Sequence, residues 1–127
     1  MNQPLKIYYI EDDKQLADLL DARLKKLGYL VCGRADNACD AIDGIKTGKP
    51  DIALVDIELH GRMEGLAIGD YLVSNTDIPF VYMTGHDDAK IIEQARRTIP
   101  DGYLLKPFDD RQLKVAVEMS LRTESSD

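Results

Sequence analysis

Polar side chains of different chemistry directly follow four short apolar runs of the sequence. They are Glu11 with Asp12, then Asp56, Thr84 and Lys106. Each run has the composition of a buried strand, and ligands of an open parallel sheet bind outside the carboxyl ends of its strands. A lone aspartate after a strand is usually a helix N-cap, but acids, a hydroxyl and an ammonium at four strand ends favour a functional crevice.

The chemistry of such a crevice follows from its charge. Carboxylates packed together raise one another's pKa unless a cation joins them, and oxygen ligands without nearby His or Cys favour Mg²⁺ or Mn²⁺. A metal there could bridge to phosphoryl oxygens, with Lys106 as a second positive charge and Thr84 as a hydrogen-bond donor. Asp56 is then the candidate nucleophile, and the aspartyl phosphate it forms suits a switch.

The elements that must position these side chains alternate along the chain. We expect strands over residues 5–10, 29–33, 52–55, 80–83 and 103–105. We expect helices near residues 16–27, 38–45, 66–75, 88–98 and 110–121. Leu16, Leu19, Leu20, Leu24 and Leu27 predict the buried stripe of the first helix. Five strands alternating with five helices predict an α/β fold, a parallel sheet between two helical layers.

Local signals mark several helix ends. Asp36 or Asn37 is expected to cap the second helix, and Asp109 the last one with Gln112 as its capping-box partner. The fourth helix shows Ile91, Ile92, Ala95 and Ile99 on one side, with Pro100 as its stop.

Length and charge restrict the class of protein. The chain has 127 residues, which suits one domain over residues 1–122 and a polar tail or linker start at 123–127. Its net charge of −7 argues against non-specific binding to nucleic acid or to anionic membranes. Cys32 and Cys39 form no metal-binding pattern, and no apolar run approaches a membrane span, so we expect a cytoplasmic protein.

Residues 6 to about 122 resemble the receiver domain of two-component response regulators. The resemblance rests on four stretches, 7–13 with its acid pair, 51–56, 82–85, and 103–108 with an aromatic followed by Lys and Pro. It implies a flavodoxin-like three-layer sandwich with strand order 2-1-3-4-5. It also implies that Asp56 receives a phosphoryl group from a histidine kinase or a histidine phosphotransfer protein.

The resemblance assigns further roles at the metal. Asp12 and Asp56 would bind Mg²⁺ through their side chains, Glu58 through its backbone carbonyl, and Glu11 through water. Asp13, just beyond the acid pair, is expected to be a helix N-terminal residue instead.

The switch follows from the same resemblance. Thr84 and Lys106 would contact the phosphoryl oxygens, and the Lys106–Pro107 bond would be cis. Tyr103 would move inward as Thr84 is drawn to the phosphate, changing the surface of the fourth helix, fifth strand and fifth helix. Glu58 and His86 either tune the lifetime of the phosphate or are solvated loop residues.

One departure from the family pattern leaves the loop after Asp56 open. The stretch 60–65 looks one residue longer than in many members, so its path and the start of the third helix are not fixed by the resemblance. His60 stands in this glycine-flanked loop, where we expect a surface residue rather than a phosphorelay histidine or a metal ligand. A loop of this kind is expected more often in receivers attached to sensor kinases and related hybrids. The start at Met1 and the polar end also fit the N-terminal module of a larger sensor protein.

Other functions remain open at this point. A small aspartate-nucleophile phosphatase is the main alternative, but such enzymes usually place the nucleophile on their first strand. A docking module without phosphorylation would lack some of the site residues, and none is missing from this sequence. A flavin or mononucleotide binder would have a glycine-rich loop after the first strand, where this sequence has Glu11 and Asp12 instead. We favour a self-phosphorylating and autodephosphorylating switch over a turnover enzyme. Its expected partners are the kinase and a downstream protein or fused signalling domain, with a homodimer on phosphorylation as an option.

Overall fold

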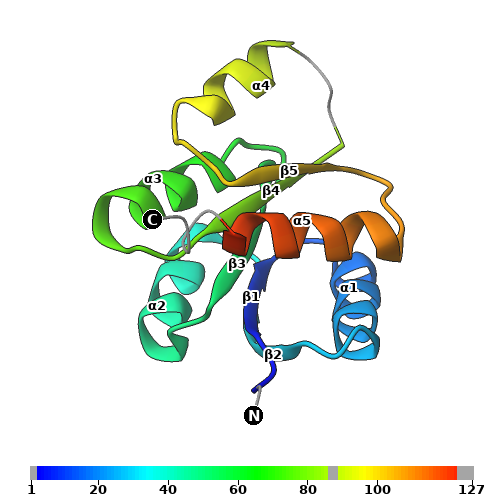
Figure 1. Cartoon of the computed structure of the whole chain (residues 1–127). Helices are drawn as coiled ribbons and strands as arrows, with labels where there is room; N and C mark the ends of the chain where they lie inside the picture. The colour runs from blue at the N-terminus through cyan, green and yellow to red at the C-terminus, as the bar shows by residue number, and fades with distance from the viewer. Residues whose placement is uncertain (1–2, 86–88, 123–127) are drawn as a thin grey trace.

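The computed structural model describes residues 3–85 and 89–122 (Figure 1). Its strands are β1 (Lys6–Ile10), β2 (Leu30–Ala35), β3 (Ile52–Asp56), β4 (Phe80–Thr84) and β5 (Gly102–Leu105). Its helices are α1 (Lys14–Lys26), α2 (Ala38–Gly48), α3 (Gly65–Asn75), α4 (Ala89–Arg96) and α5 (Asp110–Arg122). The strands form one parallel sheet in the order β2-β1-β3-β4-β5, which confirms the predicted fold class and strand order.

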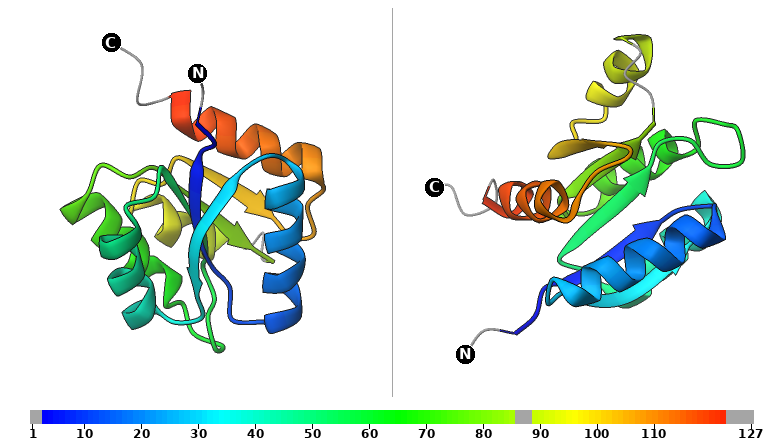
Figure 2. Two further views of the ribbon diagram at one scale, coloured as in Figure 1. Left: turned by 90° about the horizontal axis from the view of Figure 1, so that it is seen from below. Right: turned by 90° about the vertical axis from the view of Figure 1, so that its right-hand side faces the viewer.

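Helices cover both faces of this sheet. Helices α1 and α5 lie on one face, and α2, α3 and α4 lie on the other (Figures 1 and 2). Each face carries its own hydrophobic core, and every residue of β3 and β4 is buried. Burial on both faces explains why residues 52–55 are apolar throughout, without the alternation of a half-exposed strand.

The predicted helix caps are largely present. Asn37, not Asp36, caps α2, because its Oδ1 accepts a hydrogen bond of 2.9 Å from the backbone N–H of Asp40. Asp109 and Gln112 form a reciprocal capping box at the start of α5, with hydrogen bonds of 2.7 and 2.9 Å. Asp13 caps α1, as expected of a helix N-terminal residue.

The buried face of α1 differs from the predicted stripe. Leu16 and Leu19 are 44% and 54% exposed, whereas Ala17, Leu20 and Leu24 face the core. The stripe that packs against the sheet is therefore rotated toward Ala17, whose carbonyl accepts a hydrogen bond of 3.0 Å from the hydroxyl of Tyr9 on β1. The predicted burial of Leu16 and Leu19 was wrong.

Two other boundaries also differ. Strand β2 continues to Ala35 instead of ending at Gly33, because its pairing with β1 extends to the Ile10 and Ala35 pair. Helix α4 ends at Arg96, so Ile99 lies outside it, 70% exposed and with a φ of 55°. This backbone conformation is unfavourable for a β-branched residue, and Pro100 follows directly.

Arg23 connects the first helix to the start of the last. Its Nε lies 2.6 Å from Asp110 Oδ1, a guanidinium nitrogen donates to the carbonyl of Phe108 at 2.7 Å, and the guanidinium covers the Phe108 ring at 5.0 Å. Lys26 adds a second ion pair to Asp110 at 2.9 Å.

In residues 3–85 and 89–122, no helix has the length and apolar character to cross a membrane.

Candidate functional site

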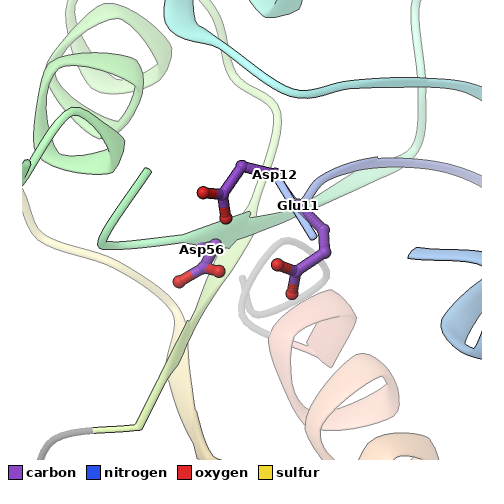
Figure 3. Close-up of side chains that lie close together, drawn as sticks. All are labelled: Glu11, Asp12 and Asp56. Atoms are coloured by element: carbon purple, nitrogen blue, oxygen red, sulfur yellow. The ribbon is translucent and has the colours of Figure 1, made fainter. Parts of the chain in front are cut away.

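Three carboxylates gather at the carboxyl edge of the two central strands β1 and β3. Glu11 and Asp12 directly follow β1, and Asp56 is the last residue of β3. One oxygen of each carboxylate lies within 4.8 Å of the others (Figure 3). Glu11 and Asp56 are 5% and 4% exposed, whereas Asp12 is half-buried. We call these three residues the acid cluster.

Lys106 reaches the acid cluster from the loop after β5. Its Nζ lies 2.7 Å from Glu11 Oε1 and 2.8 Å from Asp56 Oδ2. The peptide bond between Lys106 and Pro107 is cis. Glu11 and Asp56 thus share one ammonium, although they lie 95 and 50 positions before Lys106 in the sequence.

The electrostatics of the cluster depend on burial. Burial is the main cause that raises the pKa of Asp56 to about 7, helped by the Glu11 carboxylate and opposed by the Lys106 ammonium. The pKa of Lys106 is lowered by burial but raised overall, because hydrogen bonds to Asp56 and Glu11 outweigh that burial. When all four groups are ionised, one ammonium faces three carboxylates. Two negative charges are then left for another cation to neutralise.

The donor set fits Mg²⁺ or Mn²⁺. Its oxygens are hard carboxylate ligands, and they border an open hollow of about 360 Å³ that Glu58 and Gly61 also line. The N–H of Glu58 donates to Asp56 Oδ1 at 3.2 Å, while Lys106 holds Oδ2. Hydrogen bonds therefore hold both carboxylate oxygens of Asp56.

Thr84 lies at the same edge of the sheet. It is the last residue of β4, it is 4% exposed, and it follows Met83, the residue paired with Asp56. Its carbonyl accepts a hydrogen bond of 2.7 Å from the N–H of Lys106, so the ends of β4 and β5 are tied together beside the acid cluster.

The other predicted residues are more dispersed. Tyr103 is on β5, away from the acids, 40% exposed and with its ring 6.3 Å from that of Tyr82. Glu58 lines the hollow beside Asp56, whereas His86, its predicted partner in tuning phosphate lifetime, lies outside the described residues. The same holds for Asp88, the expected start of the fourth helix, and for the tail at 123–127.

The loop after β3 takes a definite path that the sequence left open. Leu59 and Arg62 pair across a two-residue turn, and α3 begins at Gly65 instead of Leu66. Gly65 donates to the carbonyl of Ile57 at 2.8 Å, and a Cβ at this position would overlap the carbonyl oxygen of Asp56. A glycine is needed there for close approach, and this packing fixes the start of the helix.

His60 is a residue whose contacts sequence reasoning missed. The sequence predicts a surface residue, and its side chain is 53% exposed, but its backbone N–H donates to Asp12 Oδ2 at 2.9 Å. The signal that could have identified it is a histidine followed by glycine in a loop one residue longer than usual, the pattern of a tight turn.

Known proteins share this architecture. The family model for the response regulator receiver domain matches residues 7–118. The receiver domain of a modulated diguanylate cyclase from Desulfovibrio desulfuricans G20 is 32% identical, with a TM-score of 0.88 over 96% of this chain and 97% of that one.

Two further structures are similar. The N-terminal domain of a response regulator/sensory box/GGDEF three-domain protein from Carboxydothermus hydrogenoformans is 31% identical, with a TM-score of 0.80 over 94% of this chain and 95% of that one. A CheY-like receiver domain protein from Methanospirillum hungatei JF-1, at 23% identity and a TM-score of 0.85 over 96% and 97% of the two chains, shows the shared fold. The match over most of the sequence and the common sheet topology identify the chain as a member of the response regulator receiver domain family of two-component signalling.

Proposed function

We propose that this chain is a phosphorylation-driven switch in which Asp56 accepts a phosphoryl group from a phosphohistidine. The observation that carries the proposal is the shared contact of Lys106 with Glu11 and Asp56 beside the half-buried Asp12. Three side chains, from the segments after β1 and β5, converge on one nucleophile at the end of β3. Such a pre-arranged set of charges is what phosphoryl transfer to a carboxylate requires.

The chemical step uses one oxygen of Asp56. It forms a bond to phosphorus while the P–N bond of the phosphohistidine breaks, and the released imidazole nitrogen takes up a proton. Asp12 and Asp56 would hold Mg²⁺ or Mn²⁺ through their side chains, Glu58 through its carbonyl and Glu11 through water. The bound metal supplies positive charge to the phosphoryl oxygens.

Lys106 and Thr84 complete the site. The ammonium of Lys106 would contact one phosphoryl oxygen, and the hydroxyl of Thr84 would donate to another. Thr84 is joined through its carbonyl to Lys106, at the end of the strand that carries Tyr103. Drawing Thr84 toward a phosphate would leave space for the half-exposed Tyr103 ring, which alters the surface formed by α4, β5 and α5.

The partners proposed are a histidine kinase or phosphotransfer protein and a downstream signalling domain. Similar receivers belong to a modulated diguanylate cyclase and to a three-domain GGDEF protein, which supports a receiver that works as a module of a larger sensor. The phosphatase alternative is not favoured, because such enzymes usually carry the nucleophile on their first strand. Asp56 ends the third strand of this chain. Self-phosphorylation and autodephosphorylation, rather than turnover, are the proposed activity.

The test is covalent labelling of Asp56. With Mg²⁺ and acetyl phosphate, intact-mass measurement should show one added phosphoryl group, and EDTA should prevent it. Asp56→Asn should abolish the mass gain, whereas Asp51→Asn should retain it, because Asp51 directly precedes β3, at the opposite edge of the sheet from Asp56. A mass gain that survives Asp56→Asn, or none in the unaltered chain, would refute the proposal.

A further inference from the structure

The loop after β3 contains a two-residue hairpin that directs one amide toward the acid cluster. Leu59 and Arg62 exchange two backbone hydrogen bonds, of 2.8 and 3.0 Å. Between them, His60 and Gly61 have φ values of 55° and 75°, the left-handed pair found in type I′ turns. Because the turn is closed by residues 59 and 62, the N–H of His60 is directed outward, and it donates to Asp12 Oδ2 at 2.9 Å.

The ring of His60 fastens this turn to a third loop. Its Nε2 lies 2.9 Å from the carbonyl oxygen of Asp36, between β2 and α2. A carbonyl oxygen only accepts hydrogen bonds, so Nε2 carries the proton in this contact. The other ring nitrogen, Nδ1, lies 3.9 Å from Asp12 Oδ2. One residue therefore joins the loops after β1, β2 and β3.

We infer that His60 is a positioning residue for the cation site, which it serves by holding the Asp12 carboxylate through its own backbone N–H. The hydrogen bond fixes one oxygen of Asp12, and the ring contact with Asp36 fixes the turn that carries the donor. The His60 ring is not one of the three side chains whose ligand atoms lie within 4.8 Å of one another at this site. The inference rests on the proposed role of Asp12 in binding the cation.

The energetic reason is pre-organisation. A carboxylate held in place by a charge-assisted hydrogen bond loses less freedom when it binds a cation. Loss of an outer-shell partner typically weakens metal affinity about 10- to 100-fold. Because the ring of His60 is 53% exposed and the amide itself survives substitution, we expect about a three- to tenfold loss here.

The matched variants are His60→Gly and Lys49→Gly. Glycine at position 60 keeps the positive φ and the backbone N–H but removes the ring. Lys49 also has a positive φ, 46°, but it lies at the end of α2 that points away from the acid cluster. Both variants make the same backbone change, and only one of them removes the ring contact.

MgCl₂ is titrated into each metal-free protein by calorimetry at pH 8, without a phosphoryl donor. The Mg²⁺ dissociation constant should rise three- to tenfold in His60→Gly and stay within twofold in Lys49→Gly. The amide proton resonance of residue 60, shifted by the Asp12 carboxylate, should move toward random-coil values only in His60→Gly. Melting temperatures in EDTA should stay within a few degrees, since the ring is half-exposed.

An Mg²⁺ affinity of His60→Gly within twofold of the unaltered chain would overturn the inference, as would equal weakening in both variants. This outcome is separable from failure of the proposed function. If Asp56 is phosphorylated but His60→Gly binds Mg²⁺ as tightly as the unaltered chain, only the positioning role of His60 is refuted. If Mg²⁺ binding weakens as expected but Asp56 takes up no phosphoryl group, only the proposed function is lost.

Discussion

The central strands and the β5–α4 region differ in how firmly they are held. All residues of β3 and β4 are buried, and so are four of the five residues of β1. In β5 only Leu104 is buried, and Ala95 is the buried residue of α4. The acid cluster belongs to the first region, and Tyr103 belongs to the second.

Strand β5 is paired with β4 along its length, whereas side-chain contacts hold the α4 end of the second region to the first. The hydroxyl of Tyr82 on β4 lies 2.6 Å from Thr98 Oγ1, just beyond α4, and Thr98 donates to the carbonyl of Ala95 at 2.7 Å. The Tyr82 ring also lies near that of Tyr103. Segments with few buried apolar contacts open at low free energy. We therefore expect the proposed phosphoryl transfer to depend on the buried strands and the proposed switch to use the more exposed α4 and β5 edge.

The largest effect should come from Gly65→Ala. The added Cβ would overlap the carbonyl oxygen of Asp56 and lie 2.6 Å from Ile57 Cα, so backbone in the rigid region must move. We expect a loss of about 3–5 kcal/mol in the free energy of unfolding, measured with urea. Gly102→Ala in β5 is the matched control, because its Cβ would make an ordinary contact of 3.6 Å with Val81. Equal losses of unfolding free energy in the two variants would show that the two regions do not differ in how tightly they are packed.

A medium effect is expected from Asp56→Asn in EDTA. The pKa of Asp56 is raised to about 7 in the folded chain, so the folded state binds more protons than the unfolded state between about pH 4 and 7. The stability contributed by this proton is present in acid and is lost as pH rises through 7. Asparagine does not titrate, and the variant should therefore be more stable by roughly 1–3 kcal/mol at pH 8.

The pH profile is the control for that effect. Urea unfolding measured from pH 4 to 8 should show the advantage of Asp56→Asn shrinking toward pH 4. Asp51→Asn, at the exposed residue directly before β3, should show no such gain. An advantage that grows in acid would show that burial does not dominate the electrostatics of Asp56.

The smallest effect concerns the link between the regions. Thr98→Val should cost about 1–2 kcal/mol, because it leaves the buried Tyr82 hydroxyl without this acceptor. Tyr82→Phe should cost less, since Thr98 still donates to Ala95. Amide hydrogen exchange should accelerate in α4 and stay unchanged in β3 for either variant. Faster exchange in β3 would mean that the two regions open together.

Much of this contrast was visible in the sequence. The continuous apolar run at residues 52–55 predicted a strand buried on both faces, and the polar residues that end each strand predicted a shared edge. These features depend on residue type and strand direction, and both can be recognised locally. The sheet order came from the family resemblance.

The features that were missed depend on packing or on backbone atoms. Leu16 and Leu19 have the same spacing as a buried stripe, and only the packing of the folded chain shows that Ala17 faces the core instead. Ile99 extends an apolar pattern past the point where α4 ends. The partner of the His60 ring is a carbonyl oxygen of Asp36, a group present in every residue, so no side-chain pattern could indicate it.

The contact of Arg23 with Phe108 and Asp110 has a consequence for synthesis of the chain. These residues are 85 and 87 positions apart, so α1 leaves the ribosome well before its partners exist. Its apolar face shares a core with Leu113 and Val117 of α5, which are made later. A nascent chain that stops before residue 108 therefore leaves that face uncovered, and protease resistance of α1 should appear only once α5 has emerged.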